Sequence, residues 1–161
     1  MTASAFSLDG TPWSLAAEKV DPQLLYAVAL AESQKTVDGQ VRPWPWALNV
    51  QGKGYYFDTR EEAEDHLAAT IARGVKNVDI GPLQINYNWH GHRIVEPSDL
   101  FDLATSVRVG ADILSEALGS APHDRVLAVG RYHNWKDEHR ARQYGTKVLK
   151  YFDIIVKAGG R

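Results

Sequence analysis

Glu32 has the setting in this sequence that most favours chemistry. It ends an apolar run, and positions 25, 28, 29 and 32 share one helical face, so Glu32 lies beside Leu25, Val28 and Ala29. Removal from water and the negative end of the helix dipole would both favour a protonated carboxyl, the form that a general acid requires. A solvated glutamate at a helix end would explain the same residues, so this segment alone leaves both interpretations open.

Two later segments carry polar side chains that could bind a sugar. The stretch DIGPLQIN places Gln84 and Asn86 after a Gly-Pro turn, and amides suit the N-acetyl and hydroxyl groups of a sugar. The stretch GRYHNW places Tyr132 beside His133 and Asn134, where a tyrosine hydroxyl could orient a carboxyl group. A turn with satisfied polar groups and a core tyrosine are the ordinary alternatives.

The histidines of the HGH stretch, His90 and His92, could be metal ligands together with His133 and His139. No carboxylate stands at metal-site spacing beside them, so hydrogen-bonded or surface histidines are the better interpretation. We therefore expect no metal and no cofactor.

Aromatic residues gather in PWPW (Pro43–Trp46), with Tyr55, Tyr56 and Trp89 elsewhere. They could stack on sugar faces, or they could form a small core beneath a hairpin. The sequence favours neither interpretation.

Local signals predict the elements that must position these residues. Asp21-Pro22 starts a helix over 22–33, and Thr59 with Glu62 forms a capping box that opens a helix over 60–73. The segments 47–50 and 54–57 read as a short β-hairpin, whereas 34–49 and 77–92 contain glycine and proline that exclude long regular elements. Further helices are expected from Thr105 or Ser106 to Gly119, over 125–132, and over 137–157, the last ending at Gly159-Gly160.

Composition sets the broad class. The 161 residues are 44% hydrophobic and 24% charged, as in a soluble globular protein, and are most simply a single domain, 1–161. The formal net charge of −2 gives no nucleic-acid footprint, and the absence of cysteine excludes disulfides, thiol nucleophiles and thiolate metal sites. No apolar run is long enough to span a membrane. The start, MTASAFSLDG, lacks the features of a signal peptide.

Four ordered motifs carry a family resemblance: ALAES, NVDIGPLQIN, ATSVRVGADIL and AVGRYHN. Their order resembles the SLT-type lytic transglycosylases, a branch of the lysozyme-like superfamily, over about residues 20–135. The segment between Glu32 and the glutamine loop looks like that of the members associated with conjugation and type IV secretion. The resemblance implies a lysozyme-like fold, mainly α (α+β), with a small β-hairpin insertion around residues 47–57.

The resemblance also implies roles for individual residues. Glu32 matches the catalytic acid/base, Ser33 its companion in a substrate-binding motif, and Gln84 a substrate-contacting glutamine. Tyr132 matches the tyrosine that orients the glutamate or the sugar. Asn86 and Asn134, with His133, are the further expected substrate contacts. This chain departs from the family where Pro82-Leu83 replaces Leu-Met and where His133-Asn134-Trp135 follows the tyrosine.

The implied reaction uses one carboxylate, whereas most glycosidases use two. Glu32 would protonate the oxygen between N-acetylmuramic acid and N-acetylglucosamine while the substrate's acetamido oxygen assists, and would then deprotonate the C6 hydroxyl to close a 1,6-anhydro ring. A hydrolytic muramidase with Asp79 as second carboxylate, and a non-catalytic glycan-binding module of a cell-wall-spanning assembly, are the alternatives.

The expected partners are peptidoglycan strands and a secretion or conjugation complex. We expect a monomer in the periplasm or cell envelope, with any leader removed or outside this sequence.

Overall fold

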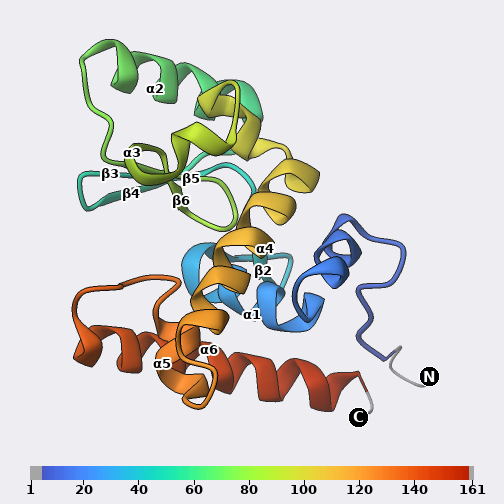
Figure 1. The fold of residues 1–161 in the computed structure, drawn as a ribbon. Helices are drawn as coiled ribbons and strands as arrows, with labels where there is room; N and C mark the ends of the chain where they lie inside the picture. The colour runs from blue at the N-terminus through green and yellow to red at the C-terminus, as the bar shows by residue number, and fades with distance from the viewer. Residues whose placement is uncertain (1–4, 160–161) are drawn as a thin grey trace.

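The computed structural model describes residues 5–159 (Figure 1). It is mainly helical, as the sequence predicts, and it has two small antiparallel sheets where the sequence predicts one short hairpin. In chain order the elements are η1 (Pro12–Glu18), α1 (Pro22–Ser33), β1 (Gln34–Val37), β2 (Gln40–Pro43), β3 (Ala47–Val50), β4 (Lys53–Tyr56), α2 (Arg60–Ala72), β5 (Val78–Ile80), β6 (Ile85–Asn86), α3 (Tyr87–His90), η2 (Gly91–Arg93), η3 (Pro97–Phe101), α4 (Leu103–Ser120), α5 (Arg125–Gly130) and α6 (Glu138–Ala158). Residues 1–4, part of the stretch examined for a signal peptide, and Gly160 lie outside the described residues.

Helix α1 has the bounds that the sequence predicts. The Asp21 side chain accepts a hydrogen bond from the Gln23 amide at 2.8 Å, and Pro22 occupies the first turn, where its missing N–H costs nothing. Six of its side chains are buried apolar ones that point in several directions: Leu24, Leu25, Ala27, Val28, Ala29 and Leu30. A helix that is apolar on most sides lies inside the fold, and α1 is accordingly part of the main hydrophobic core.

The predicted hairpin around 47–57 is confirmed as β3 and β4, which pair antiparallel from Ala47 opposite Tyr56 to Val50 opposite Lys53. The segment 34–49, from which a long element was excluded, also contains the short hairpin β1–β2. Its turn residues Asp38 and Gly39 both have positive φ, 51° and 75°, and Asp-Gly is the pair that a two-residue hairpin turn favours.

The segment 77–92, expected to be a loop, holds four short elements. Strands β5 and β6 extend the sheet to the order β4-β3-β5-β6, and α3 and η2 follow. Gly81-Pro82 does interrupt the chain, but at a turn between paired strands. Strands this short show no periodicity in a sequence; β5 forms by pairing with β3, and β6 by pairing with β5.

The later helices differ from the prediction at their ends. Helix α4 begins at Leu103 rather than near Thr105, because the Asp102 side chain accepts from the Thr105 amide at 2.9 Å, and it continues past Gly119 to Ser120. Helix α5 has the predicted cap, Asp124, but ends two residues before the predicted Tyr132. The capping box of α2 and the end of α6 at Gly159 are confirmed.

Helices α5 and α6 cross at two glycines. A Cβ atom built on Gly130 would lie 1.9 Å from the carbonyl oxygen of Ala141, and one on Gly145 would lie 2.0 Å from that of Val126. Only glycine permits this approach of one backbone to another. The crossing fixes the chain that leaves α5 against α6.

The elements form an upper and a lower group (Figure 1). Helix α2 and the sheet β3–β6 lie at the top, α5 and α6 form the base, and α4 runs from one group to the other. Helix α1 contacts both α6 and α4. Its C-terminal end lies where the two groups meet, because Ser33 bonds to Pro82 in the upper group and Glu32 to Tyr144 on α6. Within residues 5–159 no helix is both long enough and apolar enough to cross a bilayer.

Candidate active site

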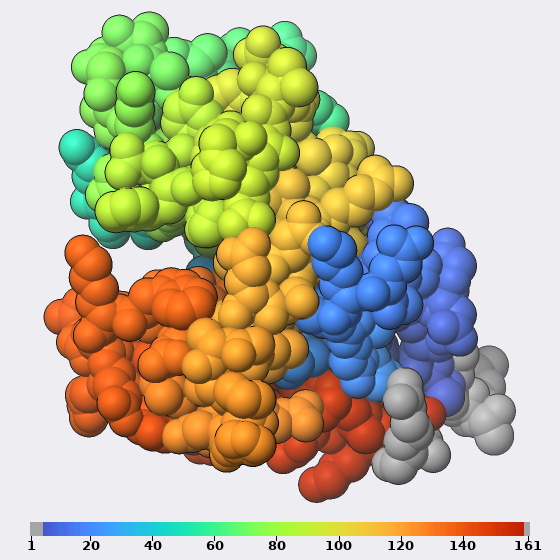
Figure 2. Space-filling view, in the orientation of Figure 1, coloured from blue at the N-terminus to red at the C-terminus, as the bar shows by residue number. Residues whose placement is uncertain are grey.

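A cavity of about 630 Å³ contains most of the residues that the sequence singles out. In Figure 2 a recess opens between the yellow-green segment that includes β6, α3 and η2 and the orange segment that follows α5. The cavity is lined by Glu32, Asp79, Gln84, Ile85, Asn86, Trp89, His90, His92, Arg93, Ile113, Tyr132, His133, Asn134, Trp135 and Lys136. A concave site with acidic, amide and aromatic groups suits a polar ring-shaped ligand such as a sugar.

Glu32 lies at the end of α1 with its side chain 13% exposed. The hydroxyl of Tyr144, on α6, donates a 2.6 Å hydrogen bond to its Oε1. The Nδ1 atom of His133 lies 3.7 Å from the same oxygen, which is an ion-pair distance rather than a hydrogen bond. The His133 and Tyr144 rings stack, with centroids 4.7 Å apart and planes 8° apart. Glu32 is therefore held at one oxygen by two side chains from outside its own helix.

The electrostatics of this cluster centre on Glu32. The interaction between His133 and Glu32 raises the pKa of His133, although burial of His133 opposes the shift. Burial, and then the charge of Glu32, raises the pKa of Tyr144 well above its usual range, so the Tyr144 hydroxyl keeps its proton and acts as a donor. His133 is thus the histidine of this cluster, and the neighbouring Glu32 side chain favours its protonated form.

Ser33 is placed differently from the substrate contact expected of it. Its side chain is fully buried and lies outside the cavity. Its hydroxyl donates to the Pro82 carbonyl oxygen at 2.7 Å and accepts from the Trp44 amide at 3.1 Å. Ser33 therefore joins the end of α1 to the Gly-Pro turn. Lys147, on α6, donates to the Ala31 carbonyl oxygen at 3.2 Å and places a positive charge at the same helix end.

The turn Gly81–Gln84 positions the predicted glutamine. Gly81 has φ of 80°, and a Cβ there would lie 2.2 Å from the Leu100 carbonyl oxygen, so the turn needs glycine. Gln84 has φ of 47°, and its Nε2 donates to the carbonyl oxygens of Ala47 and Gly81 at 3.2 and 2.9 Å. The side chain is held by the backbone while lining the cavity.

Tyr132 supports this turn. Its hydroxyl donates to the Leu83 carbonyl oxygen at 2.9 Å, and burial raises its pKa well above the usual range. The tyrosine hydroxyl that contacts Glu32 is that of Tyr144 and not that of Tyr132. Tyr132 follows α5 and Tyr144 lies on α6, and the order of residues along the chain does not reveal which of them contacts Glu32.

Asp79 and Asn86 form a hydrogen-bonded pair in the cavity wall. The Asn86 Nδ2 atom donates to Asp79 at 2.8 Å and to Asn77 at 3.0 Å, while its oxygen accepts from the Trp89 amide and caps α3. Burial raises the pKa of Asp79, with a further contribution from Glu32, and the Asn86 hydrogen bond opposes the shift. Asn86 therefore uses its amide within the protein, and Asp79 is the second carboxylate of the cavity.

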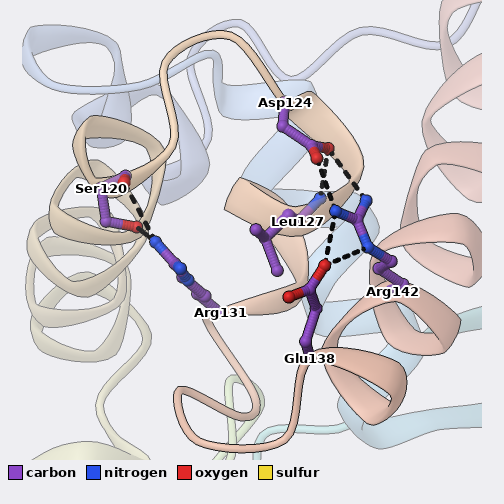
Figure 3. A network of polar contacts seen from close by, with 6 residues as sticks. All are labelled: Ser120, Asp124, Leu127, Arg131, Glu138 and Arg142. Carbon is purple, nitrogen blue, oxygen red and sulfur yellow. Dashed lines mark hydrogen bonds and ion pairs between the residues drawn. The ribbon is translucent and has the colours of Figure 1, made fainter.

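The segment between α5 and α6 carries His133 and Asn134 into the cavity, and Figure 3 shows polar contacts of the two helices that flank it. Arg142 donates to Asp124, at the start of α5, with distances of 3.2 and 2.7 Å, and to Glu138, at the start of α6, at 2.9 Å. The Asn134 side-chain oxygen accepts from two backbone amides within the segment. Arg142 thus joins the starts of the two flanking helices, and Asn134 shapes the segment from within.

Two exposed tryptophans flank the cavity. Trp89 comes from α3 and is 67% exposed, and Trp135 comes from the segment after α5 and is 55% exposed. Exposed indole faces beside a polar cavity can stack on sugar rings. Of the other aromatics, Trp46 and Tyr55 pack against the hydrophobic core. The sequence left open whether the aromatics stack on sugar or form a core, and the two interpretations apply to different residues.

His90 and His92 line the same cavity, but among the residues that the structure describes no three metal-ligating side chains gather in one place. Burial, with the charge of Arg93, lowers the pKa of His90.

Sequence reasoning missed Tyr144 and Trp135 as site residues. Tyr144 lies within the helix expected over 137–157, and 112 positions separate it from its partner Glu32. No local pattern marks such a pair.

Comparison with known proteins adds a partial likeness. Over 80 residues the chain is 35% identical to a protein from two strains of Mycolicibacterium smegmatis that bears the name "Putative ESX-1 scaffolding and assembly protein SaeB". The likeness covers 46% of this chain and spans only 10% of that much longer protein. No protein-family model matches the chain, and no solved structure matches it.

Proposed function

We propose that the protein is a peptidoglycan lytic transglycosylase, which cleaves the bond between N-acetylmuramic acid and N-acetylglucosamine without water. The observation that carries the proposal is the setting of Glu32: a largely covered carboxyl that lines a polar cavity and is held by the Tyr144 hydroxyl. The four motifs that resemble this class also support the proposal, because three of their residues, Glu32, Gln84 and Tyr132, line one cavity.

Glu32 acts first as an acid and then as a base. It protonates the glycosidic oxygen, and the bond to C1 of the muramic acid breaks as the substrate's acetamido oxygen stabilises the positive centre. The resulting Glu32 carboxylate removes the proton of the C6 hydroxyl, and the C6 oxygen closes the 1,6-anhydro ring. Such acid/base assistance contributes roughly 10²–10⁴-fold to the rate.

The chain's other residues bind and position the sugar in this scheme. The Gln84 side chain, fixed by the backbone, presents its remaining amide oxygen to an N–H or O–H of the sugar. Trp89 and Trp135 flank the strand with apolar ring faces.

Hydrolysis is the second candidate, and Asp79 is the observation that favours it. Asp79 lines the same cavity as Glu32, and burial raises its pKa. A muramidase would use it beside Glu32 to activate water. Asp79→Asn, which can still accept the Asn86 hydrogen bond, distinguishes the two. A transglycosylase keeps forming anhydro products in this variant, whereas a two-carboxylate hydrolase loses its activity.

The proposed place of action is the cell envelope, with peptidoglycan as the partner and a secretion or conjugation apparatus as the recruiting complex. The likeness to a protein named for ESX-1 scaffolding and assembly supports a link with secretion. Because that protein is named for scaffolding, the same likeness favours a non-catalytic module of an assembly as the non-enzymatic alternative.

The test is digestion of purified peptidoglycan followed by mass spectrometry. The parent protein should release muropeptides with 1,6-anhydro ends, which lack one water relative to reducing ends. Glu32→Gln should abolish release, while Glu61→Gln, the same change at an exposed position on α2, should not. Reducing ends would overturn the transglycosylase in favour of the hydrolase. Binding of glycan strands without any cleavage by the parent protein would favour the module.

A further inference from the structure

His133 lies beside Glu32 in a manner that the proposed reaction does not yet use. Its Nδ1 atom faces Glu32 Oε1 at 3.7 Å, and its ring is held by stacking on Tyr144, which donates to that same oxygen. The His133 side chain is 54% exposed and lines the cavity, whereas Glu32 is 13% exposed. A ligand in the cavity would therefore cover His133 and exclude water from its contact with Glu32.

We propose that His133 and Glu32 share one proton, which resides on the imidazole in the free protein and passes to the carboxylate when a glycan fills the cavity. This inference rests on the proposed function, because it names the source of the proton that Glu32 donates. His133 acts through Glu32 and is a positioning residue rather than a catalytic one.

The physical reason is the change in solvation. In water the charged pair of imidazolium and carboxylate is stable, and the interaction with Glu32 raises the pKa of His133. A glycan that expels water makes two charges costly, and the neutral pair of imidazole and carboxylic acid holds the same proton without them. The acid that the reaction needs is thus formed only when the substrate is bound.

The proton balance closes over one turnover. His133 gives its Nδ1 proton to Glu32, and Glu32 gives it to the leaving glycosidic oxygen. Glu32 then takes the proton of the C6 hydroxyl as the anhydro ring closes. When the product leaves and water returns, this proton goes back to the imidazole, and no other donor or acceptor is required.

Other charges around His133 modify the effect without replacing it. Asp79, from β5, also raises the pKa of His133, and Lys147, from α6, lowers it. Tyr144 and Tyr132 keep their protons, because burial and Glu32 raise both of their pKa values. Glu32 from α1 gives the largest contribution, so its removal should dominate the titration.

The first measurement does not depend on activity. The imidazole of His133 is titrated by NMR in the parent protein and in Glu32→Gln, with the exposed His123 as an internal reference. The pKa of His133 should fall by about one unit in Glu32→Gln, as expected for loss of an opposite charge at this distance in a half-exposed site, while that of His123 should not move. An unchanged His133 titration would overturn the shared proton.

The second measurement is the pH dependence of kcat/KM on peptidoglycan, which reports the titrating groups of the free enzyme. In His133→Gln the alkaline limb should move to lower pH, because a carboxyl group alone then holds the proton, and the deficit relative to the parent should grow about tenfold for each pH unit between the two limbs. His123→Gln is the matched control. A deficit that is the same at every pH would mean a structural role and would overturn the proposal. If the parent protein has no activity, the proposed function is overturned instead. The two failures are distinguishable, because the NMR titration tests the shared proton without any need for activity.

Discussion

Replacement of Gly145 by alanine should push α5 and α6 apart. A Cβ at this position would lie 2.0 Å from the Val126 carbonyl oxygen and 3.1 Å from the Gly130 nitrogen. Both atoms belong to the backbone and cannot rotate away, so the helices must separate by roughly 1.4 Å to reach an ordinary contact of 3.4 Å. Overpacking of a well-filled contact costs about 1–3 kcal/mol, and a displacement of this size belongs at the upper end.

The helix propensity of alanine offsets part of this cost. Alanine is favoured over glycine in a helix interior by about 1 kcal/mol, which leaves a net loss of about 2 kcal/mol in the free energy of unfolding. For a chain of this length the melting temperature should fall by roughly 4–8 °C. Thermal unfolding followed by circular dichroism measures it.

Gly119→Ala is the matched control, because a Cβ there meets no atom within 4 Å and the residue lies within α4. It should raise the melting temperature by roughly 1–4 °C. If Gly145→Ala melted at or above the parent while the control behaved as expected, the close crossing of α5 and α6 would be refuted. The position of Tyr144, the neighbour of Gly145, would then lose its support.

Two other predictions concern the supports of the site. Ser33→Ala removes the buried donor to the Pro82 carbonyl oxygen and should lower the free energy of unfolding by about 1–3 kcal/mol. The control Ser14→Ala, at an exposed position, should change it little. Equal melting temperatures for the two variants would contradict this prediction. Hydrogen bonds from Arg142 lower the pKa of Asp124. This contact stabilises the fold above the ordinary carboxyl pKa of about 4 and is lost as the pH falls through the lowered pKa, so the higher melting temperature of the parent relative to Arg142→Gln should shrink on acidification. A difference in melting temperature that stays constant with pH would show that the pair contributes nothing through Asp124.

Much of the helical framework could be predicted because its causes are local. The cap at Asp21, the capping box at Thr59 and the cap at Asp124 each involve residues two or three positions apart, so the sequence displays them directly. Two of the missed elements have a longer-range cause: β5 and β6 are too short to show a pattern, and β5 is held by pairing with β3 and β6 by pairing with β5. The start of α4 has a local cause that the sequence analysis overlooked, because Asp102 lies three residues before Thr105 and caps the helix.

The candidate site divides in the same way. The sequence by itself placed Glu32 at the end of a buried helix, Gln84 after a tight turn and His133 after a short helix, because each position follows from neighbours along the chain. Only the tertiary structure decided what each side chain meets. It buried Ser33 against the Gly-Pro turn, turned Tyr132 to the Leu83 carbonyl, and brought Tyr144 to Glu32 across 112 positions. Such contacts depend on how α1, α5 and α6 pack, and packing depends on the whole set of buried surfaces rather than on any one segment.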